Sequence, residues 1–529
     1  MKEWDAIVVG SGAGGGGTAQ TLAERGLSVL VLERGAWLDY SSSEHRDHLR
    51  NHRLSQYGHS TGPPLEGNDR VAVDLDGVPH LVKPHQGGYQ NNASCVGSGT
   101  HVYGGQAWRF HPLDFKMAST YGKPEGSSLA DWPISYEDLA PFYEQVEHLM
   151  GVSGGPPAPE MPTRRAYPMP PVAETKKGRL LKAGADRLGW GTQVVPLLIN
   201  SQEWDGRPGC CHCQHCVGFA CPVDAKNGTK NVVFSKWAGR PDLQLRTGAH
   251  ATKLILEERR CKGVRFLERG IEQTAYGKMV FVAASAVESA RLLLLSGVES
   301  WALGRNLQGH YYAGNSALFE DPIWDGVGPG ASIATLKFNH GNVGVIGGGM
   351  LADDFIMMPI VMAKWSRPAD VSGWGKAHKD WMRHAYPRFI NVTGPVHEIP
   401  SPLARVELDP QVRDSNGLPV ARLSGATHPE TVRTTAFMQA RGREWLEAAG
   451  AAKIWSGPPD LGLSGGQHQA GTCRMGDDPA TSVVDRNGQV HGYENLYIAD
   501  GSVHVTNGGF NPVLTIMALA RRTATLAAL

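Results

Sequence analysis

The stretch DAIVVGSGAGGGGTAQTLAERGLSVLVLERG, residues 5–35, decides the fold of the N-terminal region. Its apolar residues 6–9 predict a buried strand, Gly10, Gly12 and Gly15 then form G-x-G-x-x-G, and a second apolar strand ends at Glu33. Such glycines let the backbone approach a pyrophosphate at a helix N-terminus, and an acid about 20 residues further on can accept a ribose hydroxyl. The stretch therefore predicts a dinucleotide-binding unit, and by itself it does not separate FAD from NAD.

The composition excludes several classes of partner. The chain has 529 residues, of which 41% are hydrophobic and 19% charged, and 51 basic residues balance 51 acidic ones. Without a net basic field, nucleic acid is not an expected partner. The longest apolar stretches, MVFVAASAV and LLLLSG, are shorter than the roughly 18 residues of a membrane helix, so we expect no direct membrane insertion.

The chain start and the isolated cysteines bear on the compartment. MKEWDAIVVG enters the first predicted strand at once and leaves no space for a cleavable signal. Cys95, Cys261 and Cys473 are scattered singly, unlike the cysteines of a disulfide-stapled secreted domain. We expect a cytoplasmic protein, or a periplasmic one if a signal-bearing partner exports it.

Several motifs further along the chain occur in an order that is more specific than any one of them. With the N-terminal glycines, they resemble the glucose-methanol-choline (GMC) family of FAD-dependent oxidoreductases. They are CVGSGTHVYGG, DWPISYEDLAPFYEQVE, VFVAASAVESARLLLLSG, GRNLQGH, GGQHQAGTCRMG and NLYIADGSVHVTNGGFNPVLTIMALA.

The resemblance implies an α/β, GMC-type fold with two domains. A Rossmann-like FAD-binding domain would comprise residues 1–112, 201–310 and 456–529. A substrate-binding domain built on an antiparallel sheet with helices would comprise residues 113–200 and 311–455.

The resemblance also implies which residues hold FAD. The first glycines and the acid of the second strand would bind the ADP part, the segment from Gly97 to Gly105 would lie along the flavin, and Asp500 with Gly501 would lie near the pyrophosphate and ribitol. The predicted FAD residues are Gly10, Gly12, Gly15, Glu33, Arg34, Gly97, Gly99, Thr100, Tyr103, Gly104, Ala251, Asp500, Gly501, Asn511, Pro512 and Thr515.

In the GMC family, which the chain resembles, two segments place a pair of side chains over the flavin. The matching residues in this sequence are His468 and Asn511. Alcohol oxidation requires removal of the hydroxyl proton as the carbinol hydride leaves for flavin N5, and a neutral imidazole suits that task near neutral pH. His468 is the predicted base. Asn511 cannot titrate, so it would orient the substrate oxygen by hydrogen bonding.

Some members of the family bind flavin covalently through a histidine of the glycine-rich segment. His101 is the candidate here, but GSGTHVYGG resembles the form in which that position is apolar, with His101 one residue out of register. We therefore predict non-covalent FAD.

The loop GCCHCQHCVGFACP, residues 209–222, holds five of the eight cysteines, namely Cys210, Cys211, Cys213, Cys216 and Cys221. The spacing C-x2-C-x2-C-x4-C-P is one residue longer than a bacterial iron–sulfur run. The loop also resembles that of bacterial GMC sugar dehydrogenases with a three-iron cluster, again with one extra residue. An iron–sulfur cluster on these cysteines, metal-free thiols and zinc remain open at this stage.

The sequence therefore predicts an FAD-dependent dehydrogenase or oxidase that acts on a CH–OH group of a sugar, glycoside or polyol. Two alternatives are an oxygen-using oxidase of an apolar or sterol-like alcohol, and a non-catalytic flavoprotein that relays electrons. A cluster would imply a small subunit or a cytochrome as electron acceptor.

Overall fold

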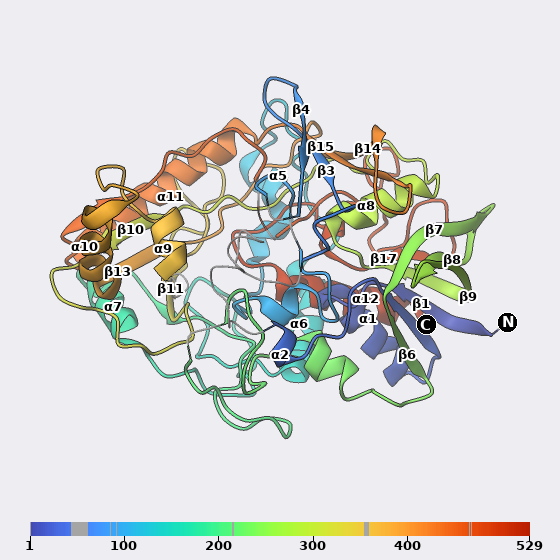
Figure 1. The fold of residues 1–529 in the computed structure, drawn as a ribbon, viewed down its shortest axis with the longest axis horizontal. Helices are drawn as coiled ribbons and strands as arrows, with labels where there is room; N and C mark the ends of the chain where they lie inside the picture. The colour runs from blue at the N-terminus through green and yellow to red at the C-terminus, as the bar shows by residue number, and fades with distance from the viewer. Residues whose placement is uncertain are drawn as a thin grey trace.

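The computed structural model describes residues 2–43, 62–84, 86–90, 92–213, 216–353, 359–464, 466 and 468–529. Figure 1 shows a lobe built around β1 and β6–β9 that contains both chain termini, and a second lobe built around β10, β11 and β13 under α11. The fold is α/β, and the predicted fold class is confirmed.

A seven-stranded sheet forms the first lobe, in the order β6-β2-β1-β9-β8-β7, with β17 also paired to β9. Its strands β6, β2, β1, β9 and β17 run parallel, and β7, β8 and β9 form an antiparallel meander. Their bounds are β1 Glu3–Val9, β2 Val29–Glu33, β6 Leu243–Thr247, β7 Ala249–Glu257, β8 Arg260–Glu268, β9 Ile271–Val282 and β17 Leu496–Ile498.

Strand β2 is buried along its whole length, as expected of a parallel strand covered on both faces. Helices α1 (Ala13–Glu24) and α12 (Val513–Ala527) pack against each other beside this sheet. The dinucleotide-binding unit is therefore assembled from the two ends of the chain and a middle segment.

A six-stranded antiparallel sheet forms the second lobe, in the order β16-β10-β13-β12-β11-β5. Its core includes Ile390 and Val392 of β13, and α11 packs on α7 through Trp445, whose Nε1 donates to the Leu181 carbonyl at 2.8 Å. The bounds are β5 Gln193–Val194, β10 Asn315–Leu318, β11 Ile333–Thr335, β12 Leu351–Asp353, β13 Phe389–Thr393, β16 Lys453–Trp455, α7 Lys176–Arg187 and α11 Pro429–Ala448.

A four-stranded sheet joins segments that the sequence places in different domains. The order is β14-β15-β3-β4, where β14 (Arg405–Arg413) and β15 (Pro419–Ser424) pair with β3 (Arg70–Val73), which in turn pairs with β4 (Pro79–Val82). Strands β14 and β15 thus lie against the first lobe although they belong to the predicted segment 311–455. The domain boundaries themselves stay a prediction.

The remaining helices are short, apart from α6, whose start follows from its sequence. Ser135 and Asp138 form a capping box, in which each side chain accepts a hydrogen bond from the other residue's backbone. The further bounds are α2 Tyr40–Ser43, α4 Gly99–Val102, η1 Pro112–Lys116, α5 Met117–Tyr121, α6 Tyr136–Met150, η2 Lys230–Phe234, α8 Ala286–Leu295, α9 Pro359–Trp365, α10 Gly375–Ala385, η3 Tyr386–Arg388 and η4 Gly501–Val503. Within the described ranges, every helix is too short or too polar to span a bilayer.

Candidate active site

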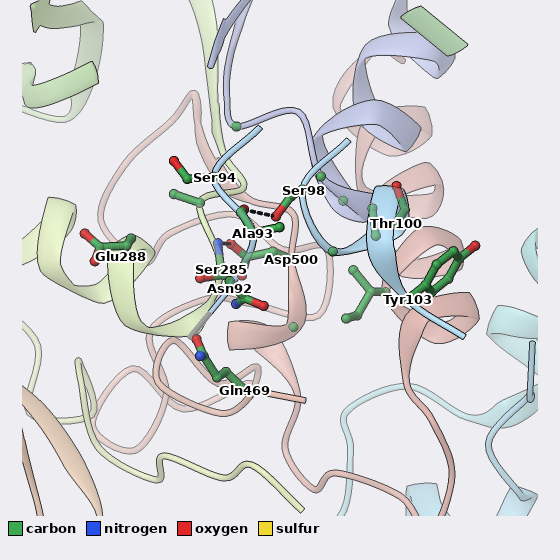
Figure 2. A pocket seen from close by; sticks show the side chains of 18 of the residues that line it. Asn92, Ala93, Ser94, Ser98, Thr100, Tyr103, Ser285, Glu288, Gln469 and Asp500 are labelled. Atoms are coloured by element: carbon green, nitrogen blue, oxygen red, sulfur yellow. Dashed lines mark hydrogen bonds between the residues drawn. The ribbon is translucent and has the colours of Figure 1, made fainter. Parts of the chain in front are cut away.

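A cavity of about 680 Å³ connects the N-terminal glycine turn with His468 and Asn511. Figure 2 shows part of its wall, where Ser98 and Tyr103 come from the glycine-rich segment and Asp500 follows β17. The Ser98 hydroxyl donates to the Ala93 carbonyl at 2.8 Å. The cavity size is within the range of cofactor sites.

Three glycines of the first turn have no space for a side chain. Gly10 has a φ of +103°, in the left-handed region, and a Cβ there would lie 2.3 Å from the Ala283 carbonyl oxygen. A Cβ on Gly14 would lie 1.8 Å from the Ala499 oxygen, and one on Gly15 would lie 1.9 Å from the Gly10 oxygen. The turn and α1 can approach the sheet this closely only with glycine at these positions.

Glu33 ends β2 at the cavity wall, as the sequence predicts for a ribose-binding acid. It accepts hydrogen bonds from the Ser11 amide at 3.0 Å, the Ser11 hydroxyl at 2.7 Å and the Gly35 amide at 2.7 Å. A carboxylate has about four acceptor positions, so a ribose hydroxyl can still be accommodated.

Most of the predicted FAD residues are brought together around this cavity. Those that line it are Gly10, Gly12, Glu33, Arg34, Gly99, Thr100, Tyr103, Gly104, Ala251, Asp500, Gly501, Asn511 and Pro512.

Three predicted FAD residues do not line the cavity. Gly15 packs against the Gly10 carbonyl within the glycine turn. The Gly97 amide donates a hydrogen bond to the Ser11 hydroxyl at 3.1 Å. Thr515 is buried within α12, where its hydroxyl lies 2.7 Å from the Tyr143 hydroxyl. These residues support the wall from behind.

Asp500 is held rigidly at the point where β17 ends and η4 begins. Its carboxylate accepts from the Ser285 amide at 2.9 Å, the Ser289 hydroxyl at 2.6 Å and the Ser502 amide at 2.9 Å. Burial raises the pKa of Asp500, and these donors oppose that shift. The serines therefore fix the carboxylate at the cavity wall.

An ion-pair network at the other end of the cavity was not predicted from the sequence. Glu288 lies between Arg70 and Arg291, and Arg291 also pairs with Asp414 at 2.6 Å. Burial disfavours the charged carboxylate, but Arg70, Arg291 and Arg34 outweigh it and hold the pKa of Glu288 well below its usual range. The strands of the four-stranded sheet bring these residues together, and no local motif signals them.

His468 and Asn511, the predicted catalytic pair, lie next to each other in the cavity wall. Asn511 Nδ2 lies 3.5 Å from His468 Nε2, and both residues line the cavity. Burial lowers the pKa of His468 to about 4, so the imidazole is neutral near pH 7. A neutral ring can accept a proton, which is the property that a general base needs.

His310 and Tyr312 surround the other edge of the His468 ring. His310 Nδ1 lies 2.9 Å from His468 Nδ1, and the Tyr312 hydroxyl lies 3.2 Å from the same nitrogen. The Asn507 side chain donates to the His468 carbonyl at 2.8 Å. Sequence reasoning placed His310 in the motif GRNLQGH but gave it no role.

The loop before Asn511 rests on a buried cluster of Asp114, His340 and His397. Asp114 accepts from Nε2 of both imidazoles, with His340 at 2.9 Å, and a Cβ on Gly508 would lie 2.7 Å from the second Asp114 oxygen. Burial opposes ionisation of Asp114, but the two imidazoles overcome it and lower its pKa. The cluster thus stays charged beneath the Gly508 backbone.

The same three side chains have the residue types of a metal site, with ligand atoms within 4.8 Å of one another. Hydrogen bonds already engage their outer nitrogens, because His340 Nδ1 lies 2.9 Å from the Tyr121 hydroxyl and His397 Nδ1 lies 3.1 Å from the Gly348 amide. These hydrogen bonds hold the cluster in place beneath the loop that contains Gly508.

The five cysteines of the loop 209–222 line one small cavity of about 10 Å³, together with Lys226. Lys226 Nζ donates to the carbonyls of Tyr103 at 2.9 Å and Phe219 at 2.8 Å, and also to that of Cys216. The described cysteines form no disulfide bond with one another, and burial raises the pKa of Cys216 to about 12. The cavity has space for about one water molecule.

Polar atoms of the cavity wall are suited to a bound flavin and substrate. Asn511 Oδ1 and Gln469 Oε1 are buried, line the cavity and have no hydrogen-bond partner among the described residues. Buried polar atoms without partners are costly and indicate a missing donor. Together with the glycine turn, these acceptor atoms fit FAD.

Comparisons with known proteins agree on one family. Models described as GMC oxidoreductase match residues 118–312 and 400–520, and an NAD(P)-binding Rossmann-like domain model matches residues 8–64. The chain is similar to 6'''-hydroxyparomomycin C oxidase of Streptomyces lividus, with 30% identity over 99% of this chain and 91% of that protein. It is also similar to the fructose dehydrogenase large subunit of Gluconobacter japonicus, with 26% identity over 98% of this chain and 97% of that protein.

Among solved structures, pyridoxine 4-oxidase from Mesorbium loti superposes with a TM-score of 0.65. The identity is 18%, and the superposition covers 99% of each chain. This likeness concerns the fold alone.

Proposed function

Because this chain belongs to the GMC oxidoreductase family, we propose that it is an FAD-dependent enzyme that oxidises a CH–OH group of a sugar, glycoside or polyol. One observation carries the proposal. A neutral histidine and an asparagine face one point of a cavity whose far end is the dinucleotide-binding turn.

The chemistry divides between the cofactor and the protein. Bound FAD supplies the two-electron acceptor for the hydride from the carbinol carbon. His468 Nε2 takes the hydroxyl proton, so that the substrate leaves as a carbonyl compound and every proton and electron is accounted for. Asn511 hydrogen-bonds the substrate oxygen and keeps it within reach of His468.

The lining near His468 favours a hydroxylated substrate. Tyr312, Asn391 and Thr393 line the cavity at this end, and Asn391 Oδ1 is buried without a partner among the described residues. Amide and hydroxyl groups recognise sugar or polyol hydroxyls, whereas an apolar alcohol would leave them unpaired. A sterol-like substrate is therefore the weaker alternative.

Anaerobic loss of flavin absorbance tests the substrate class. We expect sugars, glycosides or polyols to reduce the flavin, and sterols and simple apolar alcohols to do so poorly. Reduction by sterols alone would support the oxidase alternative, and reduction by none of the panel would support the electron-relay alternative.

We further propose that FAD is bound non-covalently. His101 lies on α4 but does not line the cavity, and burial, with Lys226 and Lys230, lowers its pKa to about 3. Acid precipitation should release all the flavin into the supernatant, as measured by its absorbance. Yellow colour in the washed pellet would demonstrate a covalent bond and contradict the proposal.

The cysteine loop has the donors for an iron–sulfur cluster, but the cavity that they line is small. A space of about 10 Å³ holds about one water molecule. The Lys226 ammonium group beside it donates hydrogen bonds to the carbonyls of Tyr103 and Phe219. The comparisons do not support a cluster either. We therefore derive no electron-transfer step through this loop.

Iron analysis of anaerobically purified protein decides the role of these cysteines. We expect less than about one iron per chain, and no broad absorbance beneath the flavin bands. A stoichiometric iron content that Cys216→Ser removes, without slowing flavin reduction, would restore the cluster prediction. It would also favour a small subunit or a cytochrome as acceptor over oxygen or a quinone.

The compartment remains part of the proposal. Cys95, Cys261 and Cys473 are scattered singly along the chain, which supports a reducing, cytoplasmic setting. A periplasmic setting, reached by export with a signal-bearing partner, is the alternative.

A further inference from the structure

His310 lies beside His468, the proposed base. Its hydrogen bonds determine which ring nitrogens of the two histidines carry protons. Its Nε2 lies 2.6 Å from the Gly508 carbonyl oxygen, and its Nδ1 lies 2.9 Å from His468 Nδ1. A carbonyl oxygen only accepts hydrogen bonds, so His310 Nε2 must carry a proton.

The charge state of His310 fixes its second nitrogen. Burial, and then the neighbouring His468 ring, hold the pKa of His310 well below its usual range, so the ring is neutral near pH 7. A neutral imidazole with a proton on Nε2 has a bare Nδ1, which is an acceptor. Two bare nitrogens at 2.9 Å would repel each other, so His468 Nδ1 must be the donor.

The same reasoning then fixes the tautomer of His468. With its single proton on Nδ1, the neutral His468 ring presents a bare Nε2, and this is the nitrogen that faces Asn511. The Tyr312 hydroxyl, at 3.2 Å from Nδ1 and 3.5 Å from Nε2, can donate or accept and therefore does not impose a tautomer.

We propose that His310 is a positioning residue that holds His468 in the Nδ1-protonated tautomer, which leaves Nε2 free to accept the substrate proton. The inference rests on the proposed function, in which His468 is the base. The acceptor chain runs from the Gly508 carbonyl through His310 to His468, so the backbone at Gly508 ultimately determines the active tautomer.

The structure holds both ends of this chain in place. The buried Glu398 carboxylate accepts from the backbone amides of Gly309 at 2.8 Å and His310 at 2.9 Å. Gly508 packs against the Asp114 carboxylate. Asn507, the residue before Gly508, donates a hydrogen bond to the His468 carbonyl at 2.8 Å. The distance between the two imidazoles is thus set by rigid backbone on either side.

Three substitutions at His310 separate the tautomer role from a merely structural one. His310→Asn places Oδ1 near the position of Nδ1, so it keeps the acceptor for His468 and loses the bond to Gly508. His310→Gln places its amide near Nε2, so it keeps the bond to Gly508 and loses the acceptor. His310→Leu loses both.

We expect the rate of flavin reduction at saturating substrate to stay within about threefold of wild type in His310→Asn. In His310→Gln and His310→Leu it should fall about ten- to a hundredfold, with FAD content and substrate affinity unchanged, because one buried hydrogen bond selects the tautomer. Equal losses in all three variants, or rescue by Gln and not by Asn, would overturn the inference.

A spectroscopic measurement gives an answer independent of turnover and of how the variants fold. In histidine-¹⁵N-labelled wild-type protein, the His468 resonances, assigned by their absence in His468→Ala, should show a protonated Nδ1 and a bare Nε2. The opposite tautomer would refute the proposal. Failure of the proposed function is distinguishable, because it would appear as full-speed flavin reduction in His468→Ala itself.

Discussion

His468→Ala should retain FAD and yet reduce it about 10³-fold more slowly than the wild-type enzyme at saturating substrate. The substitution removes the base, and general-base catalysis contributes about 10²- to 10⁴-fold. Its cavity partner Asn511 cannot titrate and cannot replace it. FAD should stay bound because the glycine turn, Glu33 and Asp500 line the cavity without help from the His468 side chain. Anaerobic stopped-flow absorbance measures both the flavin content and its rate of reduction.

A surface histidine provides the matched control for that experiment. His384 lies exposed on α10, far in the fold from the lobe that holds the cavity's glycine turn, and His384→Ala should reduce flavin at the wild-type rate. Flavin reduction at wild-type speed in His468→Ala would remove His468 from the mechanism. Loss of flavin from that variant would instead show that the ring supports the cofactor.

The dinucleotide-binding turn could be predicted because its determinants are local. Gly10, Gly12 and Glu33 lie within one strand–turn–helix–strand unit, and the backbone geometry requires glycine there irrespective of the rest of the chain. The order of the later motifs then placed His468 and Asn511 on the same cavity, although 43 residues separate them.

The residues that sequence reasoning missed act through distant partners. Nothing near His310 indicates that its ring will contact His468, 158 residues later in the chain. The pairing of Arg70 with Glu288 depends on the parallel contact of β3 with β15, which residue patterns do not specify. Thr515 is the converse case, because this predicted FAD residue does not line the cavity and its hydroxyl lies 2.7 Å from that of Tyr143.

The cysteine loop shows where spacing alone reaches its limit. Cysteines three residues apart can converge on a metal, but they can equally surround a buried amine, and the sequence does not choose between these arrangements. The structure places Lys226 beside the five thiols, with its ammonium group bonded to backbone carbonyls. A lysine ten residues after Cys216 carries no recognisable metal-site or cofactor signature, so only the folded arrangement shows that it lies beside the thiols.

Gly14→Ala should lower stability by about 3 kcal/mol or more and deprive the purified protein of most of its FAD. The added Cβ would lie 1.8 Å from the Ala499 oxygen and 3.2 Å from the Asp500 Cα, and both are backbone atoms that cannot rotate away. Overpacking costs about 1–3 kcal/mol even where side chains can adjust. Relief of this contact requires α1 to move away from β17, which pulls the pyrophosphate-binding turn from Asp500. The ratio of flavin to protein absorbance and urea unfolding measure the two effects.

Gly17→Ala on the same helix is the matched control, because its Cβ would meet nothing closer than the Met517 oxygen at 3.6 Å. Alanine is favoured over glycine within a helix by about 0.5–1 kcal/mol, so this variant should be as stable as wild type or slightly more stable, with full FAD content. Equal losses in the two variants would mean that α1 tolerates no substitution for reasons other than its distance from β17. A stable, yellow Gly14→Ala protein would show that the turn does not need the close approach on which the FAD site depends.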